Sequence, residues 1–223
     1  MLFCNDTDLL YWEPEVLREA AFVSQTLDAG TGNLSGTQFT VVTGTVFTSR
    51  GVEAGQVIVL SGAVAGCFPI AEVTGPFFLQ LGVLNDEFFP DPPATPPVLI
   101  SPGAANGLDF VIRTFWAQRR VVSDLLAQAV GIVPAGGATD APPTPQILNP
   151  QALRRAATLG TLQMIYNAMA AAATDPARFS VRADLYERLY RRAMRQAQVD
   201  VDLNGDGRAD VRRSPGLLRM VRH

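Results

Sequence analysis

Residues 30–50, GTGNLSGTQFTVVTGTVFTSR, are short runs of β-branched and aromatic residues separated by glycine. The same pattern continues through AGQVIVLSG (54–62), CFPIAEVTG (67–75) and PFFLQLGVL (76–84). Such runs favour strands, and the glycines between them indicate turns. This part of the chain therefore predicts four or five strands of a small antiparallel sheet or barrel.

Helices are predicted on both sides of this β region. A short helix is expected within residues 1–25, and in the second half of the chain apolar residues recur every three or four positions, the period of a helix with one buried face. Asn149 and Ser180 are typical N-cap residues for the last two helices. The longer helices are expected at 109–131, 149–175 and 181–198.

Together these elements predict an α+β fold. We expect a helical bundle of about four helices, with a small antiparallel β domain inserted after the first helix and a β-hairpin plus tail at the C-terminus. The segment 86–107 holds six prolines and predicts an extended connection. The expected divisions are an N-terminal helix (1–25), a β-rich insertion with its proline-rich connection (26–107), a helical domain (108–198), and a hairpin with a docking tail (199–223).

Charge is divided unevenly along the chain. Every basic residue is arginine; residues 1–112 carry two of them against twelve acids, for a net −10, and residues 113–223 carry sixteen against nine, for a net +7. Opposite charges can neutralise each other within one chain, or they can fix how neighbouring copies stack. The charged fraction is 17%, against about 25% in ordinary globular domains, which leaves room for surfaces that partners cover.

The motifs of common enzyme classes do not occur in this sequence. Its one histidine is the last residue, His223, and its two cysteines, Cys4 and Cys67, fit neither a disulfide framework nor a metal site. We therefore expect no enzymatic activity. The first residues lack the basic and apolar regions of a signal peptide, and no run predicts a membrane span, so synthesis in a reducing cytoplasm is expected.

The stretch VDVDLNGDGRADVRR (199–213) fits two structures. As a calcium loop it would use oxygen ligands at alternate positions, with Gly207 at the sharp turn. Arg213 stands at the twelfth position, where such loops carry a bidentate glutamate, so any bound Ca²⁺ would lack that ligand. The candidate metal ligands are Asp202, Asn204, Asp206 and Asp210.

As a β-hairpin, the same stretch alternates apolar and polar residues. A three-residue loop, 205–207, would set Val201 opposite Val211 and would also set Asp202 opposite Asp210, an unfavourable pair of like charges. A cation, or an arginine from a neighbouring subunit, would relieve that repulsion. The other pairs expected in this register are Asp200 with Arg212 and Leu203 with Ala209.

The last predicted helix combines an apolar stripe with many arginines. The stripe is expected to face the protein core and to contain Leu185, Leu189, Ala193 and Ala197, widened by Tyr186, Tyr190 and Met194. The arginines are candidates for contacts with neighbouring subunits or with DNA inside a channel: Arg182, Arg188, Arg191, Arg192 and Arg195.

Four segments carry a resemblance to a known family. They are DTDLLYWEPEVL (6–17), VIRTFWAQRRVVSDLLAQAVGI (111–132), LGTLQMIYNAMA (159–170) and ADLYERLYRRAMRQAQVDVDLNGDGRAD (183–210). In this order they resemble the head-to-tail connector (adaptor) proteins of tailed bacteriophages. The resemblance implies a structural virion protein, made in the bacterial cytoplasm. It would form a ring of about twelve copies beneath the portal, extend the channel through which DNA passes, and bind the next neck or tail protein.

The resemblance also implies a role for the end of the chain. In such adaptors a C-terminal segment docks onto the portal protein, and the matching residues here are Leu217, Leu218, Arg219, Met220 and Arg222. Two alternatives remain open. One is another neck or tail structural protein, such as a stopper or a tail terminator, which tend to be rich in β-structure. The other is a calcium-dependent binding module.

Overall fold

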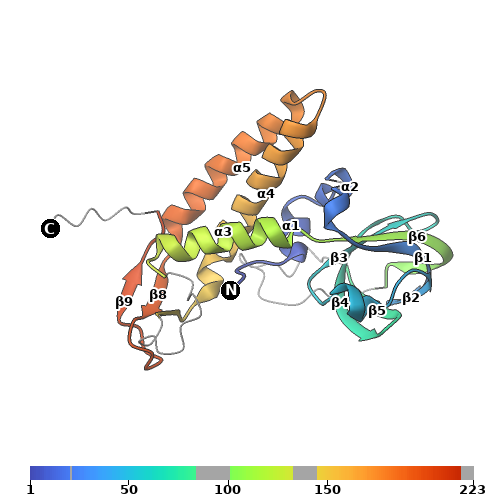
Figure 1. Ribbon diagram of the computed structural model, residues 1–223, viewed down its shortest axis with the longest axis horizontal. Helices are drawn as coiled ribbons and strands as arrows, with labels where there is room; N and C mark the ends of the chain where they lie inside the picture. Colours follow the sequence, from blue (N-terminus) through green and yellow to red (C-terminus); the bar gives the residue numbers. More distant parts are fainter. Residues whose placement is uncertain (21, 84–100, 133–144, 217–223) are drawn as a thin grey trace. The chain divides into compact units, whose positions relative to one another are not determined.

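The structure is a computed structural model of the 223-residue chain, and it describes residues 1–20, 22–83, 101–132 and 145–216. The chain divides into two compact units (Figure 1). The barrel unit runs from Asn5 to Trp116, and the helical unit combines Met1–Cys4 with Ala117–His223. No helix among the described residues is both long and apolar enough to cross a membrane.

Six antiparallel strands close into a barrel in the first unit. Around the barrel they follow the order β1-β2-β5-β4-β3-β6, and β6 pairs with both β3 and β1 to complete the circle. A closed barrel leaves no unpaired strand edge. The strands are β1 (Thr26–Gly36), β2 (Gln38–Thr43), β3 (Val57–Ser61), β4 (Gly66–Gly75), β5 (Phe78–Leu81) and β6 (Gly103–Arg113).

Alternate residues of these strands fill the barrel interior. Phe39 and Phe110 meet edge to face, with ring centroids 5.3 Å apart. Phe47, in the segment that follows β2, also packs on Phe110. Gly32 leaves space for this cluster, because a Cβ there would collide with the Phe39 ring. The remaining buried members of the cluster are Leu34, Val52, Ile58, Leu60, Ile70, Leu79, Leu81, Leu108 and Ile112.

The prediction of a helical bundle with a small inserted β domain is wrong. Strands make up about 31% of the residues that the structure describes, and the barrel is a closed unit of its own. The sequence interpretation missed β6, which occupies residues assigned to the connection 86–107 and to the start of a helix at 109. Within β6, Phe110 and Ile112 point into the barrel with Leu108, which is the period of a strand.

The N-terminal segment of the barrel unit also differs from the single helix predicted for residues 1–25. It contains two short helices, α1 (Asp6–Trp12) and α2 (Val16–Glu19). Asn5 caps α1 and forms a reciprocal capping box with Asp8. Asp6 is buried and accepts hydrogen bonds from the Thr114 hydroxyl (2.7 Å) and the Phe115 N–H (3.0 Å). A 3-10 turn, η1 (Val23–Gln25), follows α2, and a second one, η2 (Phe47–Arg50), lies further along the chain, after β2.

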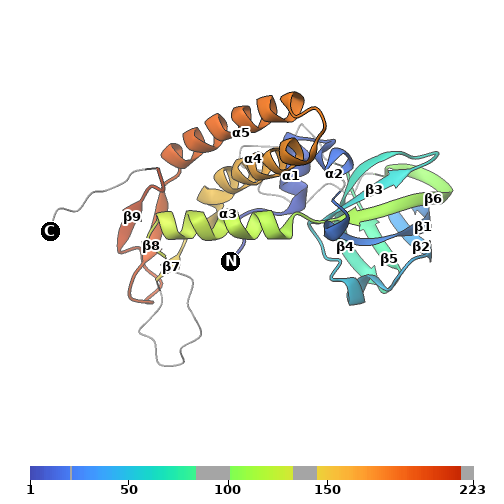
Figure 2. The ribbon, with the colours of Figure 1, turned by 45° about the horizontal axis from the view of Figure 1, so that its top comes forward.

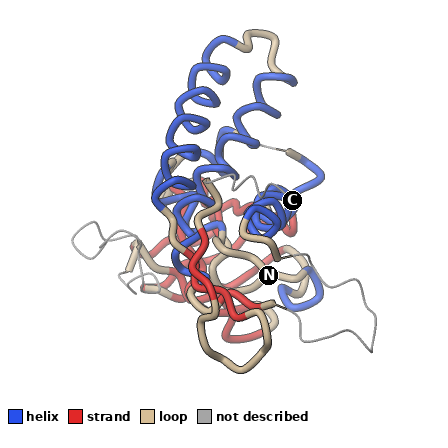
Figure 3. Tube along the Cα trace, turned by 90° about the vertical axis from the view of Figure 1, so that its left-hand side faces the viewer, coloured by secondary structure: helices blue, strands red, loops and turns tan. Residues whose placement is uncertain are grey.

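The helical unit is built around α4, which runs antiparallel to α5 (Figures 2 and 3). Gly160 of α4 lies where α3 and α5 both approach, since a Cβ there would be 2.9 Å from Val122 Cγ1 and 3.0 Å from Tyr190 Cε2. A three-stranded sheet, in the order β7-β8-β9, completes the unit. The elements are α3 (Trp116–Ala129), β7 (Gln146–Ile147), η4 (Pro150–Leu153), α4 (Arg154–Ala172), α5 (Ala177–Gln196), β8 (Val199–Asp202) and β9 (Val211–Arg213).

Of the two predicted N-caps, Ser180 is wrong, and Asn149 occupies an N-cap position without capping through its side chain. α5 begins at Ala177, so Ser180 lies within its first turn, where its hydroxyl donates to the Pro176 carbonyl (3.0 Å). Asn149 precedes a 3-10 turn and makes no side-chain cap there. Its side chain instead accepts the Asp200 N–H (2.8 Å), so it joins the start of the α4 region to β8.

Candidate functional site

The β8–β9 connection is organised by one buried carboxylate. Asp202, at the end of β8, is 1% exposed. One of its oxygens accepts the N–H groups of Asn204 (3.0 Å) and Gly205 (2.6 Å), and the other accepts that of Gly207 (2.7 Å). Both glycines have φ near +80°, a left-handed conformation that side chains disfavour.

These hydrogen bonds set the charge state of Asp202. Burial raises the pKa of the Asp202 carboxyl, but the N–H groups of Gly207, Gly205 and Asn204 outweigh burial and hold the pKa below its ordinary value. The ionised carboxylate is therefore stabilised by the backbone of its own loop.

The hairpin is present, but with a longer loop than predicted. Val201 pairs with Val211, as expected, whereas the strands end before the predicted pair of Leu203 with Ala209. The carboxylate of Asp210 accepts the Leu203 N–H (2.7 Å) rather than facing Asp202 across the ladder. The predicted like-charge pair is thus replaced by two carboxylates that each bind loop backbone.

The four candidate calcium ligands lie on this loop. Asn204 and Asp206 use side-chain oxygens to accept the N–H groups two residues further on, at 2.9 and 2.8 Å. Within the described ranges, no group of three or more His, Cys, Asp or Glu side chains is placed to hold a metal ion. The calcium site at Asp202, Asn204, Asp206 and Asp210 remains a prediction.

The predicted pair of Asp200 and Arg212 is formed beside the loop. The Arg212 Nε lies 2.7 Å from Asp200 Oδ1, and its terminal nitrogen lies 3.3 Å from Oδ2. The hydrogen bond from Arg212 holds the pKa of Asp200 below its ordinary value. With Asn149 bound to the same residue, this contact ties both hairpin strands to the start of the α4 region.

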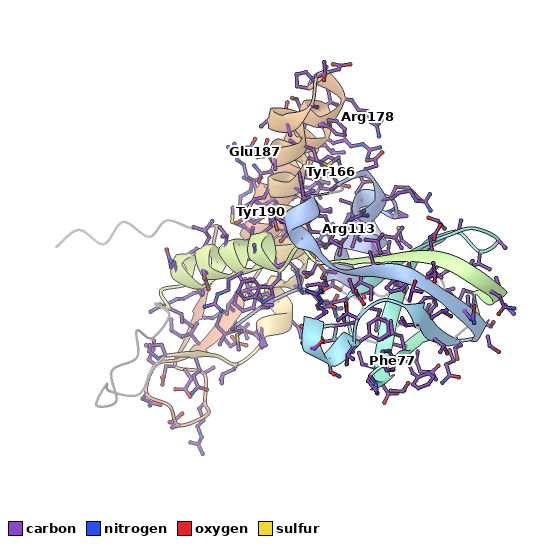
Figure 4. The ribbon with its side chains drawn as sticks, turned by 45° about the vertical axis from the view of Figure 1, so that its right-hand side comes forward. Phe77, Arg113, Tyr166, Arg178, Glu187 and Tyr190 are labelled. Carbon is purple, nitrogen blue, oxygen red and sulfur yellow. The ribbon has the colours of Figure 1, made fainter. Side chains whose placement is uncertain are left out.

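Two of the five candidate arginines on α5 are used inside the helical unit. Arg182 donates to the Tyr166 hydroxyl (2.8 Å) and lies 5.4 Å from the centre of that ring. Tyr166 in turn stacks on Tyr186, with ring centroids 5.6 Å apart (Figure 4 labels Tyr166). Arg191 forms an ion pair with Glu187 one turn away on the same helix.

The other three arginines share an exposed face of α5 with two apolar residues. Val181 is 70% exposed and Leu185 is 42% exposed, so Leu185 does not face the core as predicted. Tyr186 and Ala193 of the predicted stripe are buried, together with Ala183. The exposed α5 face, at helical spacings of three and four, consists of Val181, Leu185, Arg188, Arg192 and Arg195.

A second exposed apolar surface lies on the barrel unit. Val42 is 60% exposed and Phe77 is 41% exposed, and Phe78 beside it is also exposed. Phe77 accepts the Val41 N–H (3.0 Å), which brings the end of β2 next to the β4–β5 turn, and Figure 4 shows Phe77 projecting from that turn. We call Val42, Phe77 and Phe78 the barrel patch.

Sequence reasoning missed the barrel patch, although its signal is visible. Two adjacent aromatic residues at the start of a strand, Phe77 and Phe78, cannot both point into a barrel, because successive side chains alternate. Here Leu79 and Leu81 point inward, so Phe78 points outward.

The two thiols are in poor positions for nucleophilic chemistry. Burial, and then the charge of Glu15, raise the pKa of Cys67 to about 11. Its thiol is therefore protonated at neutral pH and reacts slowly. Cys4 is buried in the helical unit, with its sulfur 3.9 Å from the Thr161 hydroxyl.

The predicted portal-docking residues Leu217, Leu218, Arg219, Met220 and Arg222 lie outside the described residues. The chain just before them lies against the end of α5, where the Ser214 hydroxyl donates to the Met194 carbonyl (3.2 Å). No known protein family, no curated protein and no solved structure matches this chain.

Proposed function

We propose that this chain is a structural protein of the neck of a tailed bacteriophage, and that copies of it form a ring joining the portal to the tail. One observation carries the proposal: the division of charge follows the division into structural units. The barrel unit, Asn5–Trp116, has twelve acids and three arginines, for a net −9. The helical unit has nine acids and fifteen arginines, for a net +6.

A chain built from one acidic and one basic unit suits head-to-tail association. The acidic unit of each copy attracts the basic unit of another, and like units repel, so contacts between unlike units are favoured over contacts between like units. Heterologous contacts give closed rings when the rotation between copies divides a full turn. The exposed α5 face and the barrel patch add apolar surface of the kind that interfaces cover.

The order of segments that resembles the connector family supports the same assignment. Its three C-terminal members correspond to α3, to α4, and to α5 followed by the hairpin. In this reading the helical unit binds the portal and neighbouring copies, and the C-terminal residues supply a docking tail. Packaged DNA would pass through the ring without sequence-specific contacts.

The closed barrel favours a second candidate within the same class. Stoppers and tail terminators of phage necks tend to be rich in β-structure, and a six-stranded barrel forms a whole unit here. The two candidates differ in their partners, since an adaptor binds the portal ring directly whereas a terminator binds the end of the tail.

Native mass spectrometry of the purified chain, alone and mixed with the portal ring or the tail-tube protein of the same genome, tests the proposal. We expect a large complex that holds as many copies of the chain as the portal has subunits. Binding to the tail protein alone would assign the chain to the terminator candidate. A monomer that binds neither partner would contradict the proposal.

A further inference from the structure

We propose that the exposed α5 face of one copy docks on the barrel patch of a second copy of this chain. This inference rests on the proposed self-assembly and goes further by naming the two surfaces that meet. It would make the contact between copies heterologous, with a different surface on each side, as a ring requires.

On the helical side, the exposed α5 face changes character along its length. Its first turns present Val181 and Leu185, and the next turns present Arg188, Arg192 and Arg195. The ion pairs found among the described residues do not involve these three arginines. The face therefore offers apolar contact at one end and positive charge at the other.

On the barrel side, the apolar patch continues into an acid on the same outer surface. Phe78 pairs with Thr40 on β2, so Val42 lies on the same face of the sheet. Across β5, Gln80 pairs with Glu72 of β4, and Glu72 is exposed. Because residues two apart on a strand share a face, Phe78 and Glu72 lie on one outward surface, about 7 Å apart along the strands.

The two surfaces match in chemistry. Leu185 and Arg188 are one helical turn apart, about 5 Å along α5. The long arginine side chain can reach across the wider separation of Phe78 and Glu72, roughly 8 Å on neighbouring strands. Placing Val181 and Leu185 on the barrel patch would bring Arg188 within reach of Glu72. The net charges of the two units, −9 and +6, favour the same pairing.

Another exposed apolar helix face exists on α3, and it fits the barrel less well. Leu125 is 53% exposed and Val121 lies beside it on the same face. The nearby charges, Arg120 and Asp124, already pair with each other at 3.0 Å. The α3 face thus offers apolar contact without a free cation for the acidic barrel, and Leu125 provides a matched control.

Disulfide trapping between two separately purified variants tests the contact. One full-length variant carries Phe77→Cys and the other carries Leu185→Cys, and the two are mixed under mild oxidation. The native thiols interfere little, because Cys4 is buried and burial raises the pKa of Cys67 to about 11. We expect a linked pair that contains one copy of each variant.

The control replaces Leu185→Cys by Leu125→Cys, which places a thiol at an even more exposed leucine on α3. The contact is overturned if Leu125→Cys traps Phe77→Cys as readily, if Leu185→Cys links mainly to itself, or if trapping does not exceed that of the unaltered chain.

Charge reversal provides a second readout that needs no added thiol. Arg188→Glu should weaken association between copies by about tenfold, and Glu72→Arg in the same chain should restore it, as expected for a charge pair across an interface. A double variant that associates no better than Arg188→Glu alone would remove Glu72 from the contact.

These results separate this inference from the proposed function. Rings that form on the portal without trapping between Phe77→Cys and Leu185→Cys would leave the proposed function standing and overturn the contact. Trapped pairs from a chain that binds neither portal nor tail would support the contact and contradict the proposed function.

Discussion

The barrel unit and the helical unit differ in what they leave uncovered. The barrel pairs both edges of every strand and fills its interior with a cluster of aliphatic and aromatic side chains. The helical unit buries α4 but leaves apolar residues of α3 and α5 exposed, among them Leu125 and Leu185. The apolar residues of the barrel interior are therefore closed to solvent, whereas apolar side chains remain exposed on α3, on α5 and on the outer barrel surface.

The largest expected effect comes from the barrel interior. Phe110→Ala should destabilise the chain by about 3–5 kcal/mol, because it removes a fully buried ring that contacts Phe39 and Phe47. Urea unfolding measures this loss. The control Phe78→Ala, on the outer surface, should cost less than about 1 kcal/mol and should weaken association instead. Equal losses from the two variants would contradict the division between interior and outer surface.

A smaller effect is expected where α3, α4 and α5 meet. Gly160→Leu should destabilise the helical unit by about 1–3 kcal/mol, because Val122 and Tyr190 already occupy the space that a side chain needs. Hydrogen exchange should show the loss in α4 and α5 and leave the barrel strands protected. Ala168→Leu, at an exposed position of α4, is the matched control and should change little. Similar exchange in the two variants would show that Gly160 is not a contact point.

The arginines of α5 allow a finer comparison on one helix. Arg182→Ala should cost about 1 kcal/mol of stability, because Arg182 holds the Tyr166 hydroxyl and ring. Arg191→Ala should cost less than about 0.5 kcal/mol, as expected for an exposed pair one turn apart. Arg188→Ala should leave thermal stability unchanged and reduce association. The account is contradicted if Arg188→Ala lowers stability as much as Arg182→Ala does.

The smallest effect is confined to the hairpin and depends on pH. The pKa values of Asp200 and Asp202 lie below the ordinary 3.8, so the stability that they contribute is present above that value and is lost as pH falls through the depressed values. In an NMR titration the Gly207 amide signal should stay constant through neutral pH and move only below about 3.8. A midpoint at or above that value would show that the loop amides do not bind an ionised Asp202.

Calcium offers an independent check on the same loop. If the loop holds no ion, added Ca²⁺ should leave the melting temperature unchanged in both the unaltered chain and a chain with Asp202→Ala and Asp210→Ala. A rise in melting temperature with Ca²⁺ that disappears in the double variant would establish the predicted ion site.

The sequence predicted the individual strands better than it predicted how the barrel closes. The strands between residues 26 and 81 follow from runs of β-branched and aromatic residues separated by glycine turns, and the hairpin pair Val201–Val211 follows from alternation. The closing strand β6 was missed because it follows a proline-rich segment and runs almost directly into α3. Only pairing with β1 and β3, which are distant in sequence, makes residues 103–113 a strand.

The candidate association surfaces could be predicted only in part. The abundance of arginine on α5 was visible, and the predicted apolar stripe of that helix is buried at Tyr186, Ala193 and Ala197 but exposed at Leu185. Stripes containing Leu185 or Tyr186 both have helical spacing, and Tyr186 is buried because Tyr166 of α4 stacks on it. In the same way, Asp202 binds loop amides rather than facing Asp210, a choice set by the conformations of Gly205 and Gly207.

Sedimentation of the unaltered chain over a range of concentrations, at about 50 mM and about 500 mM salt, shows whether attraction between the acidic and basic units assembles the copies. The account holds that oppositely charged units draw copies together. It predicts assemblies larger than a monomer at low salt, and at least about a tenfold rise, at high salt, in the concentration needed to form them. A chain that stays monomeric at every concentration, or one whose assembly strengthens with salt, would contradict the account.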